Sequence, residues 1–147
     1  MRIQTLMDAD AKAVHEAEEE IFSDAWSEAS IKSAARAKGA VCFALFCEER
    51  LAGYVLGQEV CGEAELHRIA VLPEERGKGF GDELMQEFIR RCEGAAAYTQ
   101  FLEVRAGNRP ALSLYQKYGF SEEGRRTHYY HNPVEDALLL RRQIQET

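Results

Sequence analysis

The sequence predicts a mixed α/β fold (an α+β mixed sheet), in which a mostly antiparallel sheet is flanked by helices. Segments with helical periodicity and strand-like apolar segments follow one another in the order helix, helix, three strands, helix, strand, helix, strand, strand. The chain has 147 residues, of which 46% are hydrophobic, and this is enough for one compact domain with a core. We therefore expect a single domain over residues 1–147.

Two helices are expected first. Over Asp8–Phe22 the apolar residues recur at three- and four-residue steps behind an initial acid, which indicates a helix. Ser27 suits the N-cap of a second, shorter helix that ends near Gly39, because its hydroxyl can accept a hydrogen bond from an early backbone amide. The two helices then meet at a turn that carries Trp26.

Three strands follow these helices. Val41–Cys47 and Leu51–Val60 are rich in strand-forming residues and are separated by three charged residues, which predicts a hairpin. A turn at Gly62 and Glu63 leads to a third strand over Glu65–Leu72. This strand stops before a proline, which cannot donate a hydrogen bond to a ladder.

The second half of the chain is predicted to hold two helices and three strands. A core-facing helix covers Phe80–Cys92, because its apolar residues recur at helical spacing. A strand over Thr99–Arg105 and a helix over Asn108–Tyr118 follow. Two last strands are expected over Phe120–Tyr129 and Glu135–Gln143.

The charge balance excludes some classes of partner. With 25 acidic and 18 basic residues the formal net charge is -7, which argues against a nucleic-acid-binding surface and favours a cationic substrate. No apolar run approaches the roughly 20 residues that span a bilayer, and the N-terminus lacks an apolar signal segment. We therefore expect a soluble cytoplasmic protein with no membrane partner.

The cysteines give no support for a metal. The chain has four, Cys42, Cys47, Cys61 and Cys92, and no two form a Cys-x-x-Cys pair. The first three lie in apolar, strand-like stretches. We therefore expect no metal site and interpret the cysteines as buried, reduced thiols, which fits a reducing cytosol.

A glycine-rich run between a strand and a helix is the strongest functional signal. In the run Arg76–Gly81 glycines allow positive φ and close approach to a ligand, while the amides at the start of the next helix point toward an anion. A nucleotide-hydrolysing P-loop would carry Ser or Thr after Lys78, but Gly79 stands there. A dinucleotide fold would place the turn after its first strand, whereas three predicted strands precede the turn here. An ordinary tight turn with solvated charges remains an alternative.

The stretch Ile69–Gly81 resembles the signature of the GCN5-related N-acetyltransferase (GNAT) family, which is Arg or Gln, two residues, Gly, one residue, then Gly or Ala. The order of elements also matches the family fold. The resemblance implies that acetyl-CoA is the cosubstrate. It implies that the pyrophosphate is held by Arg76, Gly77, Lys78, Gly79, Phe80, Gly81 and Asp82, and the pantetheine arm by Ile69, Ala70, Val71 and Asn108. Asn108 is also a good N-cap.

Two residues are candidates for proton transfer. Acetyl transfer from a thioester to an amine needs a neutral amine and a proton for the departing thiolate. LEVRAGN and ALSLYQKYGF resemble the RimI branch of the family, which implies that Glu103 is the general base and Tyr115 the general acid. The alternatives are that Glu103 forms an ion pair with Arg105 or Arg68 on a sheet face, and that Tyr115 is a core tyrosine.

The same branch acetylates protein N-terminal amines. DAWSE and RTHYYHNPVEDALLL resemble its substrate-binding segments, which implies that an acceptor peptide is bound by Trp26, Tyr129, Tyr130 and Glu135. Aromatic residues that merely cover the core edge are the alternative. The acidic balance favours a basic peptide, and the resemblance implies a ribosomal protein that starts with Ala.

Two other functions stay open at this point. The first is the same chemistry on a small amine such as a polyamine or an aminoglycoside. The second is a regulator that binds coenzyme A without catalysis, against which the presence of both Glu103 and Tyr115 argues. The sequence leaves the oligomeric state, monomer or weak dimer, undetermined.

Overall fold

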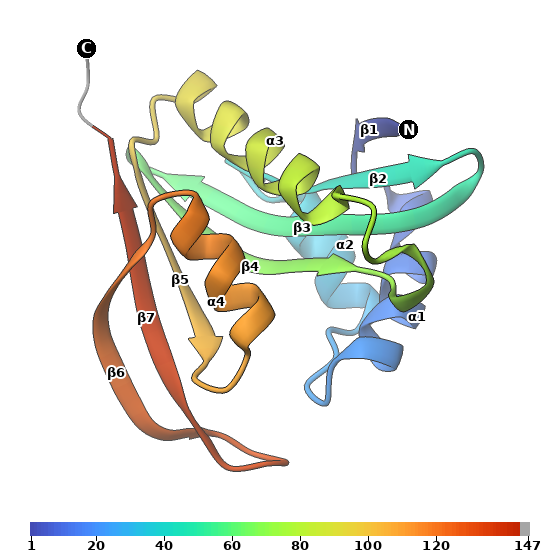
Figure 1. The fold of residues 1–147 in the computed structure, drawn as a ribbon. Helices are drawn as coiled ribbons and strands as arrows, with labels where there is room; N and C mark the ends of the chain where they lie inside the picture. The colour runs from blue at the N-terminus through green and yellow to red at the C-terminus, as the bar shows by residue number, and fades with distance from the viewer. Residues whose placement is uncertain (145–147) are drawn as a thin grey trace.

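The computed structural model describes residues 1–144, in which helices cover both faces of one seven-stranded sheet (Figure 1). In chain order the elements are β1 (Arg2–Thr5), the 3-10 turn η1 (Asp8–Asp10), α1 (Ala11–Ile21), α2 (Glu28–Arg36), β2 (Phe43–Cys47), β3 (Arg50–Val60), β4 (Glu63–Val71), the 3-10 turn η2 (Pro73–Glu75), α3 (Phe80–Gly94), β5 (Thr99–Arg105), α4 (Arg109–Lys117), β6 (Ser121–Tyr130) and β7 (Glu135–Gln143).

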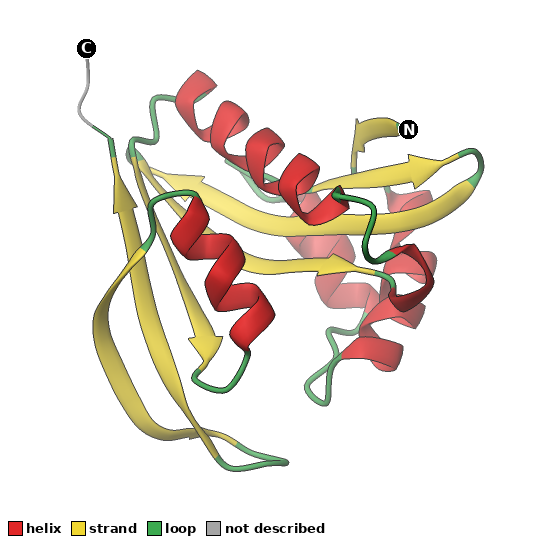
Figure 2. Ribbon diagram, viewed as in Figure 1, coloured by secondary structure: helices red, strands yellow, loops and turns green. Residues whose placement is uncertain are grey.

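The strand order in the sheet is β1-β2-β3-β4-β5-β7-β6. Every neighbouring pair is antiparallel except β4 and β5, which are parallel. The last hairpin places β7 beside β5 and leaves β6 at the edge (Figure 2). The predicted mixed, mostly antiparallel sheet flanked by helices is confirmed.

The sheet carries a core on each face, because side chains of a strand alternate between its two sides. Phe43 and Phe88, both fully buried, belong to the core between the sheet and helices α3 and α4. Tyr54 and Ile31, equally buried, belong to the core under α1 and α2. The helices on the two faces therefore hold β3 and β4 firmly between them.

A bulge in β4 changes which face its side chains reach. Gly57 on β3 pairs with Leu66, but the preceding Leu56 pairs with Arg68, so His67 is an extra residue in the ladder. Leu66 points into the core on the α3 side, and after the bulge Ala70 points into the core under α1. The bulge therefore reverses the alternation along the second half of β4.

The two parallel strands separate soon after they begin. Only Glu63–Glu65 of β4 pairs with Thr99–Phe101 of β5. Beyond these residues β4 continues beside β3, and β5 continues beside β7. The carboxyl halves of the two strands therefore leave a gap in the middle of the sheet, the kind of place where open α/β sheets bind ligands.

Three local expectations are corrected. Strand β1 was not expected, because four residues acquire strand geometry only by pairing with β2. The first helix begins at Ala11, behind the 3-10 turn, and not at Asp8. The turn between β3 and β4 is formed by Cys61 and Gly62, both with positive φ, so β4 begins at Glu63.

The expectation of four buried thiols is wrong for Cys61, which is exposed in that turn, and Cys47 is only partly buried. Cys42 and Cys92 are buried, and burial raises the pKa of both thiols, that of Cys92 to about 12. All four cysteines are free.

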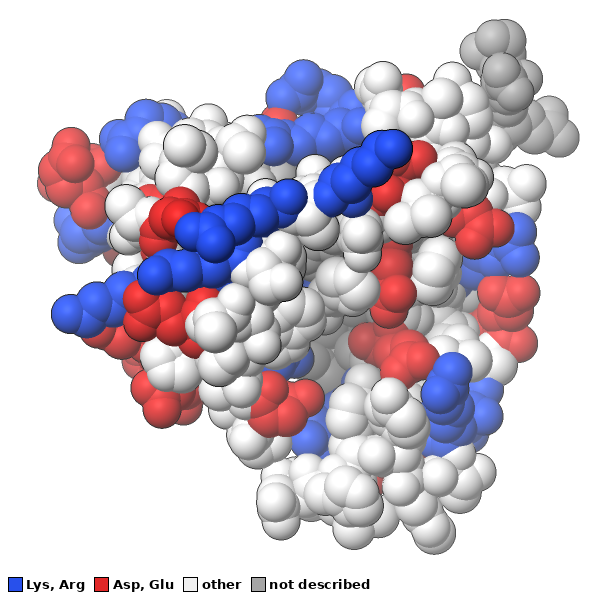
Figure 3. Space-filling model, turned by 180° about the vertical axis from the view of Figure 1, so that it is seen from behind, with Lys and Arg blue, Asp and Glu red and all other residues white. Residues whose placement is uncertain are grey.

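The surface carries interspersed charges. Seen from behind, acidic and basic side chains alternate over the visible face (Figure 3). None of the helices within residues 1–144 is both long enough and apolar enough to cross a membrane.

Candidate active site

The glycine-rich run forms an open loop that ends in the first turn of α3. Gly77 and Gly79 have φ of 81° and 83°, a left-handed conformation that other residues adopt at a cost. A Cβ atom added to either glycine would meet no atom within 4 Å. The loop therefore leaves space beside its backbone, and the unpaired amides at the N-terminus of α3 adjoin that space.

The charged side chains of this loop are tied to the protein. Glu75, only 3% exposed, accepts hydrogen bonds from Lys78 (2.8 Å) and Arg50 (3.1 Å). These bonds lower the pKa of Glu75, and the bond from Lys78 has the largest effect. Arg76 donates through Nε to the carbonyl oxygen of Val71 at 3.1 Å. Lys78 thus holds the loop in place from one side, and Arg76 closes it against the end of β4.

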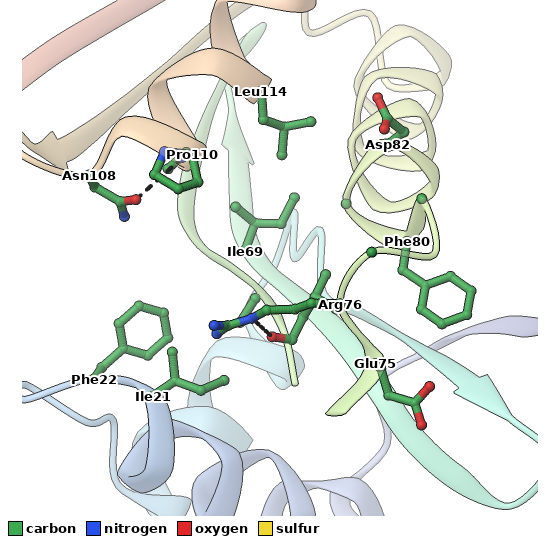
Figure 4. Close-up of a pocket in the computed structure, with 16 residues that line it drawn as sticks. Ile21, Phe22, Ile69, Glu75, Arg76, Phe80, Asp82, Asn108, Pro110 and Leu114 are labelled. Carbon is green, nitrogen blue, oxygen red and sulfur yellow. Dashed lines mark hydrogen bonds between the residues drawn. The ribbon is translucent and has the colours of Figure 1, made fainter. Parts of the chain in front are cut away.

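A cavity of about 460 Å³ lies beside the loop, between the ends of α1, α3 and α4 (Figure 4). Its lining includes all the residues predicted to bind the cosubstrate except Lys78: Ile69, Ala70, Val71, Arg76, Gly77, Gly79, Phe80, Gly81, Asp82 and Asn108. The Asp82 carboxylate accepts hydrogen bonds from Lys117 (2.6 Å) and Tyr118 (2.8 Å). These bonds connect α3 to the end of α4 and lower the pKa of Asp82. Asn108 caps α4 through a bond from the Ala111 amide (3.3 Å).

The backbone of β4 presents free polar groups to this cavity. The Leu72 amide donates to Ala52 on β3, so the backbone groups of Ala70, two residues earlier, also face β3. Those of Ile69 and Val71 face the other way, toward the gap between β4 and β5. An extended ligand could therefore form strand-like hydrogen bonds with the backbone of Ile69 and Val71. The backbone of Ala70 is directed toward β3, so only its methyl group could contact the ligand.

A smaller cavity of about 110 Å³ continues the first one into the gap. The two share four lining residues, Phe22, Ile69, Asn108 and Ala111. Glu103, Tyr115 and Tyr130 line the smaller cavity, together with Arg68 and Asp24. The structure therefore brings the two predicted proton-transfer residues together at the inner end of the glycine-loop cavity.

Glu103 lies on β5 with its side chain 27% exposed. Its neighbours Leu102 and Val104 point into the core, so the carboxylate points to the opposite face. There it lies 3.4 Å from the guanidinium of Arg126 on β6. The ion pair that was considered as an alternative therefore exists, but its partner is neither Arg105 nor Arg68.

Tyr115 is both a core residue and a cavity residue. It is 7% exposed, and its ring packs against Phe120 with the ring centroids 5.9 Å apart. Burial raises the pKa of its phenol above the ordinary value. Tyr115 also lines the smaller cavity, so its phenol can donate a proton to a group bound there.

The four residues predicted to bind an acceptor lie at different places relative to the smaller cavity. Tyr130 lines it, and burial and the Glu103 carboxylate raise its pKa to about 12. The Tyr129 ring packs edge-on against Tyr130. Trp26 is not among the lining residues, but its ring lies 5.7 Å from the ring of His67, which lines the cavity. Glu135 accepts a hydrogen bond from the Gly107 amide at 2.7 Å and lies 3.4 Å from Arg105, so its carboxylate already has partners.

A buried charge cluster beside this cavity was not predicted. Glu18 on α1 is fully buried, and its carboxylate accepts hydrogen bonds from Tyr54 and Arg68. The sequence carried a signal for it, because Glu18 occupies a position on the apolar face of the first helix. A carboxylate at such a position requires a buried partner. Which residue is that partner depends on the arrangement of the strands in the sheet.

Within residues 1–144, His, Cys, Asp and Glu side chains do not gather in any group of three or more that could hold a metal ion. The polar groups that line the two cavities include backbone amides of the glycine loop, the carboxylate of Glu103 and the phenol of Tyr115. This donor set suits an anionic ligand and a proton transfer.

Comparisons with known proteins match the chain to one family. Residues 10–120 match the family model described as Acetyltransferase (GNAT) family. The ribosomal protein bS18-alanine N-acetyltransferase of Escherichia coli (strain K12) is 32% identical over 140 residues, 94% of either chain. The N-alpha-acetyltransferase RimI of Mycobacterium tuberculosis is 38% identical over 96 residues, which cover 63% of this chain but only 59% of that protein. The crystal structure of the ribosomal-protein-S18-alanine N-acetyltransferase from Escherichia coli has a TM-score of 0.92 at 31% identity, over 99% of this chain and 95% of that one.

Proposed function

The chain belongs to the acetyltransferase (GNAT) family, and on this premise we propose that it transfers the acetyl group of acetyl-CoA to the N-terminal amino group of a protein. The proposed acceptor is a basic ribosomal protein that begins with Ala. The alignment with the bS18-modifying relative over 94% of both chains supports this choice. The observation that carries the proposal is the continuity of the glycine-loop cavity with the cavity that holds Glu103 and Tyr115.

The larger cavity fits a coenzyme that carries phosphates on an extended arm. The backbone at Gly77 and Gly79 is open to a ligand, and the start of α3 offers amides to a pyrophosphate. Ile69 and Val71 offer strand-like pairing to the arm. Bound in this way, acetyl-CoA would supply an activated thioester at the gap between β4 and β5.

The residues in the gap would then handle two protons. Glu103 takes a proton from the acceptor amine, directly or through a water molecule, so that the nitrogen can attack the thioester carbon. A C–N bond forms and the C–S bond breaks without a covalent enzyme intermediate. Tyr115 gives its proton to the departing thiolate, and burial keeps the phenol protonated until then.

The acceptor would enter between the α1–α2 segment and the β6–β7 hairpin. Trp26 and the paired rings of Tyr129 and Tyr130 provide apolar walls. Glu135, at the turn end of the hairpin, supports this groove. The net charge of -7 favours the approach of a basic peptide.

A direct test is to incubate the purified protein with acetyl-CoA and a panel of acceptors, with acetylation measured by mass spectrometry. The panel holds peptides that start with Ala, the same peptides with a blocked N-terminus and one internal lysine, and polyamines. We expect transfer to the free N-terminus only. Good transfer to a polyamine and none to the Ala peptides would support the small-amine alternative, and binding of CoA without any transfer would support the regulator.

A further inference from the structure

We propose that Arg68 is a positioning residue for the acceptor site, because it fixes the segment between α1 and α2 against β4 at the edge of the cavity that holds Glu103 and Tyr115. The identity of the acceptor rests on the proposed function. The ordering of the segment by Arg68 does not, and it can be measured separately.

The buried carboxylate of Glu18 binds Arg68 and three other parts of the chain. Both its oxygens lie 3.1 Å from Nε of Arg68, and Oε2 accepts a hydrogen bond of 2.5 Å from the Tyr54 hydroxyl. Oε1 also accepts a bond of 3.0 Å from the backbone amide of Trp26. One fully buried carboxylate therefore joins α1, β3, β4 and the segment that leads to α2.

The guanidinium of Arg68 also contacts the segment between α1 and α2 directly. One terminal nitrogen of Arg68 donates to the backbone carbonyl of Asp24 at 3.0 Å and lies 3.4 Å from its carboxylate. The guanidinium carbon lies 3.7 Å from the centre of the Phe22 ring. Arg68 therefore holds the segment 22–24 directly and holds Trp26 through Glu18.

The bulge at His67 explains why Arg68 can do this. If β4 alternated regularly and had no bulge, Arg68 would lie two residues after Leu66 on the same face and would point into the core on the α3 side. With the bulge, Arg68 reaches the α1 face with only 13% of its side chain exposed. The extra residue itself packs on the segment, because the His67 and Trp26 rings lie 5.7 Å apart. Both residues of the bulge therefore contact the same segment.

A lysine could not replace Arg68 in this arrangement. Arginine presents several donors in a fixed plane, so it can bind a carboxylate with one edge and a carbonyl with another, whereas lysine is a single point charge. Arg68→Lys keeps the positive charge beside Glu18 but loses the bond to Asp24. It therefore separates the positioning of the segment from the neutralisation of the buried carboxylate.

The single tryptophan of the chain, Trp26, reports on this segment. We expect Arg68→Lys to raise the acrylamide quenching of Trp26 fluorescence about twofold. The matched control is Arg142→Lys, because Arg142 is another partly buried arginine whose two bonds, to Tyr118 and Gln100, lie away from the segment. Equal quenching in the unaltered protein and in Arg68→Lys would overturn the proposal.

The kinetic test compares the two substrates. With an Ala-starting peptide and acetyl-CoA, Arg68→Lys should raise the KM for the peptide about tenfold, the effect of one lost hydrogen bond to a charged group. The KM for acetyl-CoA should change less than about twofold. If the unaltered protein acetylates no peptide, the proposed function fails, and the quenching of Trp26 still decides the role of Arg68.

A double variant separates positioning from stability. Arg68→Met leaves Glu18 buried without its charge partner and should lower the Tm, whereas Glu18→Gln together with Arg68→Met removes both charges and should recover most of it. We expect the peptide KM to stay high in the double variant. Recovery of the peptide KM together with the Tm would show that Arg68 is merely structural.

Discussion

The carboxylate of Glu135 accepts a hydrogen bond of 2.7 Å from the backbone amide of Gly107. This bond joins the first residue of β7 to the loop between β5 and α4, which carries Asn108 at the edge of both cavities. A Cβ atom on Gly107 would lie 2.7 Å from the same oxygen, so the Glu135 carboxylate would have to shift if residue 107 carried a side chain. This contact thus links the β6–β7 hairpin to the loop that carries Asn108.

Glu135→Leu should therefore raise the KM for both substrates severalfold, because the hairpin and the Asn108 loop lose their common anchor. Steady-state kinetics with each substrate varied in turn measures both values. Glu122→Leu is the control, because Glu122 is exposed on β6 and, among residues 1–144, forms an ion pair with Arg125 alone. A rise in the peptide KM alone would instead indicate that Glu135 contacts the peptide and anchors nothing.

Glu103→Gln should lower kcat by about 100-fold or more, the usual contribution of a general base. The affinity for acetyl-CoA should stay the same, because the side chain lies in the smaller cavity and not beside the glycine loop. Single-turnover rates and calorimetric titration with CoA give the two quantities. An equal loss of rate and of CoA affinity would exclude a role as base.

Tyr115→Phe keeps the ring that packs on Phe120 and removes only the hydroxyl. We expect kcat to fall by about 100-fold with the Tm unchanged. An exposed tyrosine ionises at about pH 10. Because burial raises the pKa of Tyr115, its phenol stays protonated above that pH. We therefore expect that no decline in kcat near pH 9 depends on Tyr115. A decline that is present in the unaltered protein and absent from Tyr115→Phe would contradict the assignment.

Gly79→Ala should weaken CoA binding about tenfold. Alanine in the left-handed conformation of Gly79 costs roughly 1–2 kcal/mol, and the new methyl group would occupy the open space beside the loop. Gly94→Ala is the matched control, because Gly94 also has no atom within 4 Å but lies at the helical end of α3 without positive φ. That change should leave CoA binding unaltered; if both variants bind CoA as the unaltered protein does, the loop is not the phosphate site.

The sequence alone was sufficient for features that depend on neighbouring residues. The caps at Ser27 and Asn108 and the glycine turn before α3 are local, so the helices after them were predicted close to their observed bounds. The family resemblance also placed Glu103 and Tyr115, and the structure brings both to one cavity. Local signals failed for β1, a short strand that exists only through its pairing with β2.

Membership of the acetyltransferase family and the position of the glycine loop were therefore determined by the sequence itself, because a turn, a cap and a periodic helix are encoded within a few residues. The partners of the charged side chains were decided only by the tertiary structure. Glu103 lies beside Arg126, which β6 brings across the sheet edge, and Arg68 meets Glu18 because one bulge turns it to the other face. Such pairings depend on strand register, and a shift of one residue moves every following side chain to the opposite side of the sheet.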